Sequence, residues 1–310
     1  MRKLKLRSFQ SPGDIVMLTA AIRDLHRSHP GEFLTSVDTS CNALFENNPY
    51  ISTFSPGTEV EVINCEYPLV NASNSCGKHF IHGYIDDLNH KLGLKINLTE
   101  FKGDIYLSEQ ERNWTPQVEE LTGDNTPYWI INAGGKFDFT NKWWASDRYQ
   151  QVVNKLQGKV RFVQIGEVGH MHKPLDNVVN LIGKTDLRQL VRLIYHAQGV
   201  LCPVTAVMHL AKAVPLKQEQ AMRGCVVIAG GREPVQWEAY PEHRFLHRVG
   251  QLSCCKFGGC WKSRVVPLND GDEKDESLCE KPINGLPACM DMITADEVVA
   301  AIQSYDHFFN

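Results

Sequence analysis

The feature that most constrains the fold of this 310-residue chain is a regular alternation of short apolar strands with amphipathic helices. In the first half, the pattern predicts strands at residues 4–9, 33–37, 59–63 and 105–107, with helices at 15–25 and 80–92. A second series predicts strands at 128–132, 160–165, 178–181, 199–202 and 225–229, with helices at 147–156, 185–198 and 206–213. Alternating strands and helices favour two doubly wound α/β domains.

The same pattern predicts the domain boundaries. The first domain covers residues 1–125 and the second covers 126–250. A cysteine-rich segment follows at 251–293, and a last helix at 294–310 begins at Thr294, with Glu297 in the capping-box position. In open α/β folds ligands bind beyond the carboxyl ends of the strands, so we expect a binding cleft where the two domains face each other.

Composition excludes several classes of protein. The hydrophobic content of 43% and charged content of 22% are typical of a soluble globular chain. The net charge of −4 argues against a nucleic acid as the main partner. No apolar run approaches 18 residues, and no apolar segment follows the basic residues at the start. We therefore expect a cytoplasmic protein without a membrane span, and its assembly state stays open.

Five cysteines lie in the segment 251–293, which is rich in Gly, Pro and Asp and can build little apolar core. In a reducing compartment such a cluster indicates a metal site before it indicates disulfides. We predict a structural tetrathiolate site for iron or zinc, with Cys255 or Cys254 completing a set formed by Cys260, Cys279 and Cys289. Ordinary buried thiols are the alternative, and they suit the five cysteines elsewhere in the chain, namely Cys41, Cys65, Cys76, Cys202 and Cys225.

Two polar motifs open the two domains. Gly13 and Asp14 follow the first strand, where Asp14 either caps the next helix or acts as a general base, and the residues alone favour the cap. Gly134 and Gly135 follow the strand that opens the second domain, with Lys136 and Lys142 close behind. Glycines there expose backbone N–H groups to an anion, although a plain turn would have the same composition.

Three further motifs follow strands of the second domain. Thr205, Ala206 and His209 would place a helix N-terminus and an imidazole beside a diphosphate, although a lone histidine among apolar residues more often belongs to the core. Gly231, Arg232 and Glu233 suit a nucleotide or sugar contact, or a surface ion pair. The segment 182–187 adds Lys184 to the candidate donor-binding residues.

The order of these motifs over residues 1–250 resembles glycosyltransferase family 9, the ADP-heptose:lipopolysaccharide heptosyltransferases. The resemblance implies the two-domain GT-B fold, an acceptor-binding first domain and a second domain that binds a nucleotide-sugar, with ADP favoured. It also implies an inverting transfer of a heptose-like sugar without a metal at the reaction centre. Asp14 would be the catalytic base. The implied donor-binding residues are Gly13, Gly134, Gly135, Lys136, Lys142, Lys184, Thr205, Ala206, His209, Gly231, Arg232 and Glu233.

This sequence departs from the family pattern in two places. Val204 and Ala206 stand where the family has Asp and Gly of an Asp-Thr-Gly motif, which puts the nucleotide in doubt. The cysteine-rich tail is similar to the iron-finger of autotransporter heptosyltransferases, with different spacing. A carbohydrate, protein or lipid-linked acceptor therefore stays open. The alternatives are a non-catalytic nucleotide-sugar or carbohydrate binder and a glycosyltransferase that modifies protein or DNA bases.

Overall fold

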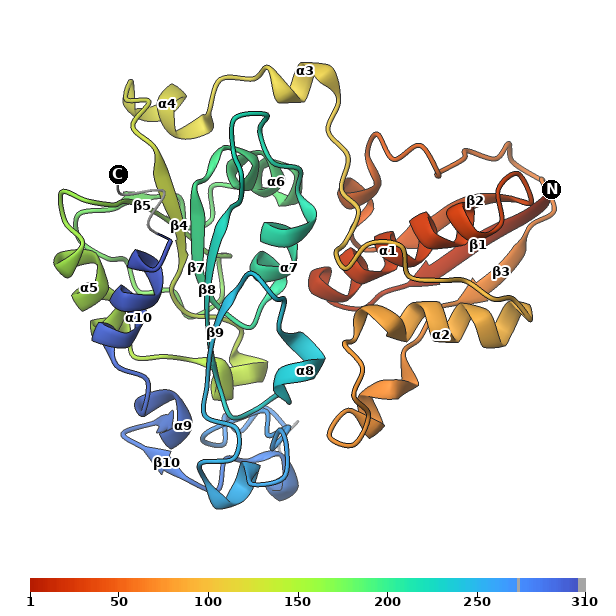
Figure 1. The fold of residues 1–310 in the computed structure, drawn as a ribbon. Helices are drawn as coiled ribbons and strands as arrows, with labels where there is room; N and C mark the ends of the chain where they lie inside the picture. The colour runs from red at the N-terminus through yellow and green to blue at the C-terminus, as the bar shows by residue number, and fades with distance from the viewer. Residues whose placement is uncertain (272–273, 306–310) are drawn as a thin grey trace.

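The computed structural model describes residues 1–271 and 274–305, and two parallel sheets divide most of this chain into two domains (Figure 1). The sheet of the first domain has the order β2-β1-β3, with every pair parallel. Its strands are β1 (Arg2–Ser8), β2 (Phe33–Thr39) and β3 (Glu61–Asn64), and its main helices are α1 (Pro12–Ser28) and α2 (Ile81–Leu92), with short 3-10 turns η1 (Asn42–Phe45) and η2 (Pro68–Ala72). The loop from β1 into α1 therefore leaves the middle of this sheet.

The second domain has a six-stranded parallel sheet of order β6-β5-β4-β7-β8-β9. The strands are β4 (Tyr128–Asn132), β5 (Arg161–Ile165), β6 (Val179–Asn180), β7 (Gly199–Pro203), β8 (Gly224–Gly230) and β9 (Arg244–His247). Its connections include η3 (Phe137–Lys142), α5 (Ser146–Lys155), α6 (Leu187–His196), α7 (Ala206–Ala213) and α8 (Val235–Glu238). The strand order reverses between β4 and β7, so the loops after these two strands meet at the point where doubly wound sheets bind ligands.

The predicted strand at 105–107 is wrong. This stretch is an extended connection that leads to two short helices, α3 (Glu109–Arg112) and α4 (Gln117–Thr122), which run between the domains (Figure 1). Ile105 and Leu107 are buried in the hydrophobic core. Their apolar alternation therefore reflects packing against the core rather than strand pairing.

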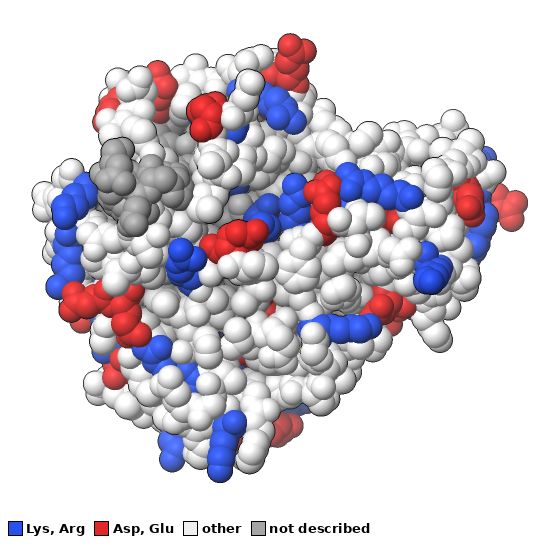
Figure 2. Space-filling view, in the orientation of Figure 1, with Lys and Arg blue, Asp and Glu red and all other residues white. Residues whose placement is uncertain are grey.

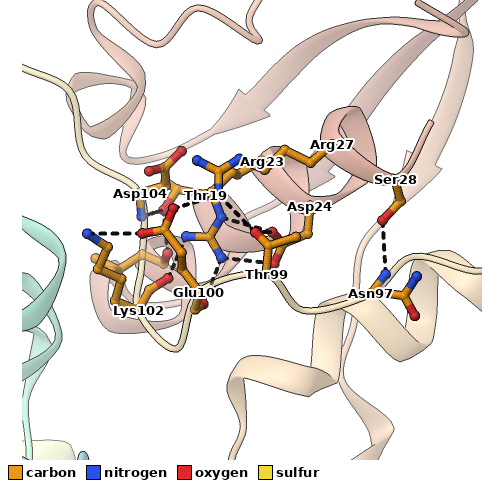
Figure 3. A network of polar contacts seen from close by, with 11 residues as sticks. Thr19, Arg23, Asp24, Arg27, Ser28, Asn97, Thr99, Glu100, Lys102 and Asp104 are labelled. Atoms are coloured by element: carbon orange, nitrogen blue, oxygen red, sulfur yellow. Dashed lines mark hydrogen bonds and ion pairs between the residues drawn. The ribbon is translucent and has the colours of Figure 1, made fainter. Parts of the chain in front are cut away.

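A polar network fixes this connection to α1 (Figure 3). The fully buried Arg23 makes two hydrogen bonds of 2.9 Å to Asp24, and it also donates to the carbonyl oxygens of Glu100 and Lys102. Thr99 donates to the same Asp24 carboxylate at 2.5 Å. These contacts hold Gly103 against Val16 of α1 and Ala213 of α7, where a Cβ would lie 2.4 Å and 2.9 Å from their side chains. The connection is thus part of the junction between the domains.

The cysteine-rich segment packs on the second domain and also reaches the first. It contains the 3-10 turns η4 (Ser253–Cys255) and η5 (Asp275–Ser277), a hairpin of β10 (Pro282–Ile283) and β11 (Leu286–Pro287), and the short helix α9 (Ala288–Asp291). The Asn74 amide of the first domain exchanges two hydrogen bonds with the backbone of Gly259, at 2.9 Å and 2.8 Å. This segment therefore bridges the two domains on one side of the junction.

The last helix, α10 (Ala295–Gln303), packs against α5 and β8, so it belongs to the core of the second domain. The predicted C-terminal element extended to 310, and residues 306–310 lie outside the described part. Within residues 1–271 and 274–305, no helix combines the length and the apolar character needed to cross a membrane.

Candidate functional site at the domain junction

Asp14 lies in the first turn of α1, where the chain leaves the central strand of the first sheet. Its Oδ2 accepts the Ser11 backbone N–H at 3.0 Å, so the carboxylate does cap the helix. Its Oδ1 accepts a short hydrogen bond from the Tyr67 hydroxyl. Burial raises the pKa of Asp14, and Glu238 raises it further, whereas the Tyr67 hydrogen bond, His209 and the Ser11 N–H lower it. The cap and the base are therefore compatible roles of one side chain.

The N-terminal turn of α7 faces Asp14 from the second domain. A Cβ at Gly13 would lie 3.0 Å from the His209 ring, so glycine permits this close approach of α1 to α7. Thr205 precedes the helix, and its buried Oγ1 has no hydrogen-bond partner among the described residues. An unsatisfied hydroxyl at a helix N-terminus is suited to an anionic ligand.

His209 connects Asp14 to two groups that the sequence did not indicate. Its Nδ1 is 3.0 Å from the Tyr240 hydroxyl, and its Nε2 is 3.4 Å from Oε2 of Glu238. Burial lowers the pKa of His209 to about 3, so the ring is neutral at pH 7. Burial and the nearby Glu233 raise the pKa of Glu238 to about 8. Both groups are therefore held in their uncharged forms.

A second cluster of charges lies beside them. Lys142, at the end of η3, pairs with Glu233 at 2.8 Å, and Arg232 pairs with the same oxygen of Glu233. Burial would raise the pKa of Glu233, but the charges of Arg232 and Lys142 outweigh it and the pKa is lowered. Lys142 also donates to the Val204 carbonyl at 3.3 Å, next to the turn into α7. The positive charge of this cluster thus lies beside the α7 N-terminus.

The structure does not bring all of the remaining predicted donor-binding residues to this site. Gly135 exchanges two backbone hydrogen bonds of 3.0 Å with Met171, so its N–H group is already used. Gly134 has a φ of 131°, and a Cβ there would overlap the Met171 carbonyl. Lys136 is exposed, and Lys184 is exposed after β6, where it donates to the Asn180 carbonyl. Because β5 and β4 separate β6 from β7, the structure does not bring Lys184 to His209.

Four of the cysteines gather around the turn after β8. A Cβ at Gly230 would lie 3.1 Å from the Cys289 sulfur, and one at Gly231 would lie 2.9 Å from the Cys255 sulfur. The Cys260 backbone N–H donates to the Gly231 carbonyl at 3.1 Å, and the thiol groups of Cys260 and Cys279 interact electrostatically with that of Cys289. In the described ranges, however, no three His, Cys, Asp or Glu side chains are arranged to hold a metal ion, so the predicted tetrathiolate site is not confirmed.

The predicted set of site residues omitted Tyr67, Glu238 and Tyr240. Glu238 follows the Gly230–Gly231 turn closely, so its position after a strand was a usable signal. Tyr67 and Tyr240 carry no comparable signal, because their roles come from contacts with Asp14 and His209 that only the tertiary fold creates.

Three buried histidines at the junction predict acid sensitivity. Burial lowers the pKa of His79, His209 and His243 to about 3. The unfolded chain binds these protons near pH 6.5 and the folded chain does not, so stability is complete above pH 6.5 and is lost as pH falls toward 3. We expect the urea midpoint to fall between pH 6.5 and 4.5, and to fall less steeply in His79→Gln. The exposed His90→Gln serves as control, and a midpoint constant over this range would contradict the prediction.

Comparisons with known proteins bear on the fold and the family of this chain. Residues 69–218 match the family model described as glycosyltransferase family 9 (heptosyltransferase). No curated protein sequence shows a significant match. A glycosyl transferase family 9 structure from Veillonella parvula shares 14% identity over 98% of this chain and 96% of its own, with a TM-score of 0.64.

Two Escherichia coli structures are also similar. The ADP-heptose lipopolysaccharide heptosyltransferase II shares 15% identity over 98% of both chains, with a TM-score of 0.58. The iron-containing dodecameric glycosyltransferase TibC shares 15% identity over 99% of this chain and 78% of its own, with a TM-score of 0.62. At these identities the structures show a common fold of the GT-B type. Together with the family match, they support an enzyme of the glycosyltransferase class.

Proposed function

We propose that this glycosyltransferase moves a heptose-like sugar from an ADP-linked donor to an acceptor hydroxyl, with inversion at the anomeric carbon. The observation that carries the proposal is the position of Asp14, which faces His209 and the N-terminus of α7 across the domain junction. Asp14 takes the proton from the acceptor hydroxyl as its oxygen attacks the anomeric carbon. Burial raises the pKa of Asp14, and the Tyr67 hydrogen bond opposes this and favours the ionised carboxylate that this role requires.

The second domain holds the donor in this proposal. The diphosphate lies at the N-terminus of α7, where Thr205 has an unsatisfied hydroxyl. Lys142 and Arg232 supply positive charge where negative charge develops on the leaving group. ADP-heptose is the donor of choice because a heptosyltransferase of the same fold, TibC, has been solved in complex with ADP-D-β-D-heptose.

We propose a carbohydrate, protein or lipid-linked acceptor rather than a nucleic acid. On the face shown in Figure 2, lysines and arginines are interspersed with aspartates and glutamates, and they form no broad basic surface. A polyanion requires such a surface. The ten free thiols among the described residues are consistent with a reducing compartment, the cytoplasm.

Release of ADP from ADP-heptose tests the function directly. The purified full-length chain is incubated with ADP-heptose and a panel of glycan and protein acceptors, and ADP and the glycosylated product are both measured. We expect stoichiometric ADP and product with at least one acceptor. Tight binding of ADP-heptose without turnover on any acceptor would instead favour a nucleotide-sugar binding protein.

We propose that the cysteine-rich segment binds a structural iron or zinc ion. The donor chemistry fits, because Cys255, Cys260, Cys279 and Cys289 interact electrostatically and backbone N–H groups of Gly231, Lys262 and Lys281 point at three of the sulfurs. A metal here would hold the turn after β8 and the Gly259 contact to Asn74 in place. It would supply no chemistry to the transfer, since all four ligand positions are closed.

Removal of one of these thiols is expected to lower metal content and stability together. Cys260→Ser should lose the bound metal and melt at a lower temperature, because a structural metal stabilises only the folded chain. Metal analysis and thermal unfolding of the same preparations provide the measurement, and Cys76→Ser in the first domain is the matched control. Wild-type stability in metal-free protein would remove the structural role.

A further inference from the structure

Glu238 is a buried carboxyl group, and one of its two oxygens forms no hydrogen bond among the described residues. The residue is 8% exposed, and the oxygen in question is Oε2. It ends α8, which is anchored to the first domain by a 3.1 Å hydrogen bond from the Phe80 N–H to the Trp237 carbonyl. Buried carboxyl groups normally have partners, so a proton on this oxygen could go either to the nearby His209 ring or to a ligand bound at the junction.

The arrangement around His209 indicates where a proton lies. The Tyr240 hydroxyl donates to the sulfur of Met17 at 3.6 Å, which leaves its oxygen to accept the Nδ1 hydrogen of His209. The lone pair of the neutral ring is then on Nε2, which is 3.4 Å from Glu238. A protonated Glu238 can donate to this nitrogen, whereas an ionised Glu238 would place two acceptors against each other.

The charges around Glu238 come from both domains. From the second domain, Glu233, Lys142, Arg232, His209 and Tyr240 interact with it, and Glu233 opposes its ionisation more strongly than either Lys142 or Arg232 favours it. From the first domain, Asp14 and Tyr67 interact with it, and the His79 ring bonds its backbone. A donor diphosphate at the start of α7 would add negative charge nearby and would tolerate only a neutral carboxyl group.

We propose that Glu238 is a second catalytic residue, a general acid that donates its proton to the departing diphosphate oxygen while Asp14 acts as the base. This inference rests on the proposed function. The acceptor O–H bond breaks and its proton moves to Asp14, and the acceptor oxygen bonds to the anomeric carbon. The bond from that carbon to the diphosphate oxygen breaks with its electron pair on oxygen, which takes the proton of Glu238. The enzyme gains one proton at Asp14 and loses one at Glu238. After the products are released, both carboxyl groups return to their starting protonation states by exchanging protons with water.

In this chain the carboxyl group of Glu238 lies beside a motif that lacks the aspartate of the family pattern. Val204 occupies the position of the aspartate in the Asp-Thr-Gly motif, and Glu238 brings a carboxyl group to the same side of the junction from α8. Catalysis would then depend on an ionised Asp14 and a protonated Glu238. Activity is expected to rise with pH as Asp14 loses its proton and to fall near pH 8 as Glu238 loses its own.

The test compares pH profiles of kcat/KM for ADP-heptose in the wild type, Glu238→Gln and Glu238→Ala. We expect Glu238→Gln and Glu238→Ala each to lower kcat by about 10²-fold or more, and Glu238→Gln to lose the decline near pH 8. Glu242→Gln is the matched control, since Glu242 forms a surface ion pair with Lys212. A decline near pH 8 that persists in Glu238→Gln, or wild-type kcat in Glu238→Ala, would overturn the proposal.

A measurement independent of turnover separates this inference from the proposed function. In a ¹³C titration of labelled glutamate side chains, we expect one carboxyl group to titrate near pH 8 in the wild type and to be absent from Glu238→Gln. If every glutamate titrates below pH 6, the acid role is excluded even when sugar transfer is observed. If the glutamate titrates as expected but no sugar is transferred, the proposed function fails and the catalytic role of Glu238 fails with it.

Discussion

Asp14→Asn is expected to lower sugar transfer by about 10²–10⁴-fold while ADP binding is retained. The amide keeps the size of the carboxylate and can still accept the Ser11 N–H, so the start of α1 is preserved. It cannot take a proton from the acceptor hydroxyl. The loss should therefore lie in kcat, and the affinity for ADP, measured by calorimetry, should change little.

Tyr67→Phe distinguishes a base from a helix cap in the same assay. The Tyr67 hydrogen bond lowers the pKa of Asp14, so its removal should raise that pKa and move the acid side of the pH profile upward. A mere cap would leave the profile in place. Near-wild-type transfer in Asp14→Asn would remove Asp14 from the mechanism.

Asp24→Ala is expected to be the most destabilising of the substitutions considered. Arg23 and Asp24 are both fully buried, and the substitution removes the one carboxylate among the described residues that accepts hydrogen bonds from the Arg23 guanidinium. Breaking such a pair from one side costs about 3–5 kcal/mol in the free energy of unfolding. The loss should also loosen the connection that carries Gly103, because Thr99 donates to the same carboxylate (Figure 3). Chemical denaturation followed by circular dichroism gives the measurement.

The neighbouring ion pair on the same helix provides the control. Arg27 pairs with Glu100 at 2.5 Å, but the two side chains are 38% and 36% exposed. Exposed pairs contribute at most about 1 kcal/mol, so Arg27→Ala should be mild. Equal effects of Asp24→Ala and Arg27→Ala would show that burial of the Arg23–Asp24 pair has no special role.

Much of the fold is readable from the sequence because hydrophobic periodicity is local. The strands that form β1, β2, β4, β5, β7 and β8 were predicted within a few residues, since each is a short apolar run bounded by turn residues. The expected strand at 105–107 failed because the same alternation arises when an extended connection buries every second side chain. An alternation of apolar residues predicts which side chains are buried, but it does not predict whether the segment pairs with a neighbouring strand.

The candidate site is less readable, because it depends on contacts between domains. Asp14 and His209 follow strands and could be selected as candidates, yet a helix cap and a core histidine have the same local sequence. Their proximity results from the packing of α1 on α7, Glu238 at the end of α8 contacts His209, and Tyr67 reaches Asp14 from within the first domain. Lys184 is the opposite case. Its motif stands in the order that the family resemblance predicts, but Lys184 follows β6, which lies at the edge of the sheet.

Nucleotide binding by this protein tests whether the domain junction holds an ADP-linked donor. The melting temperature would be measured with ADP, GDP, UDP and CMP, and with the matching nucleotide-sugars. A donor site at the start of α7 predicts a rise with ADP and ADP-heptose alone, since a ligand that binds only the folded chain raises its stability. An unchanged melting temperature with every nucleotide, or a rise with a different nucleotide only, would contradict an ADP-sugar donor at this junction.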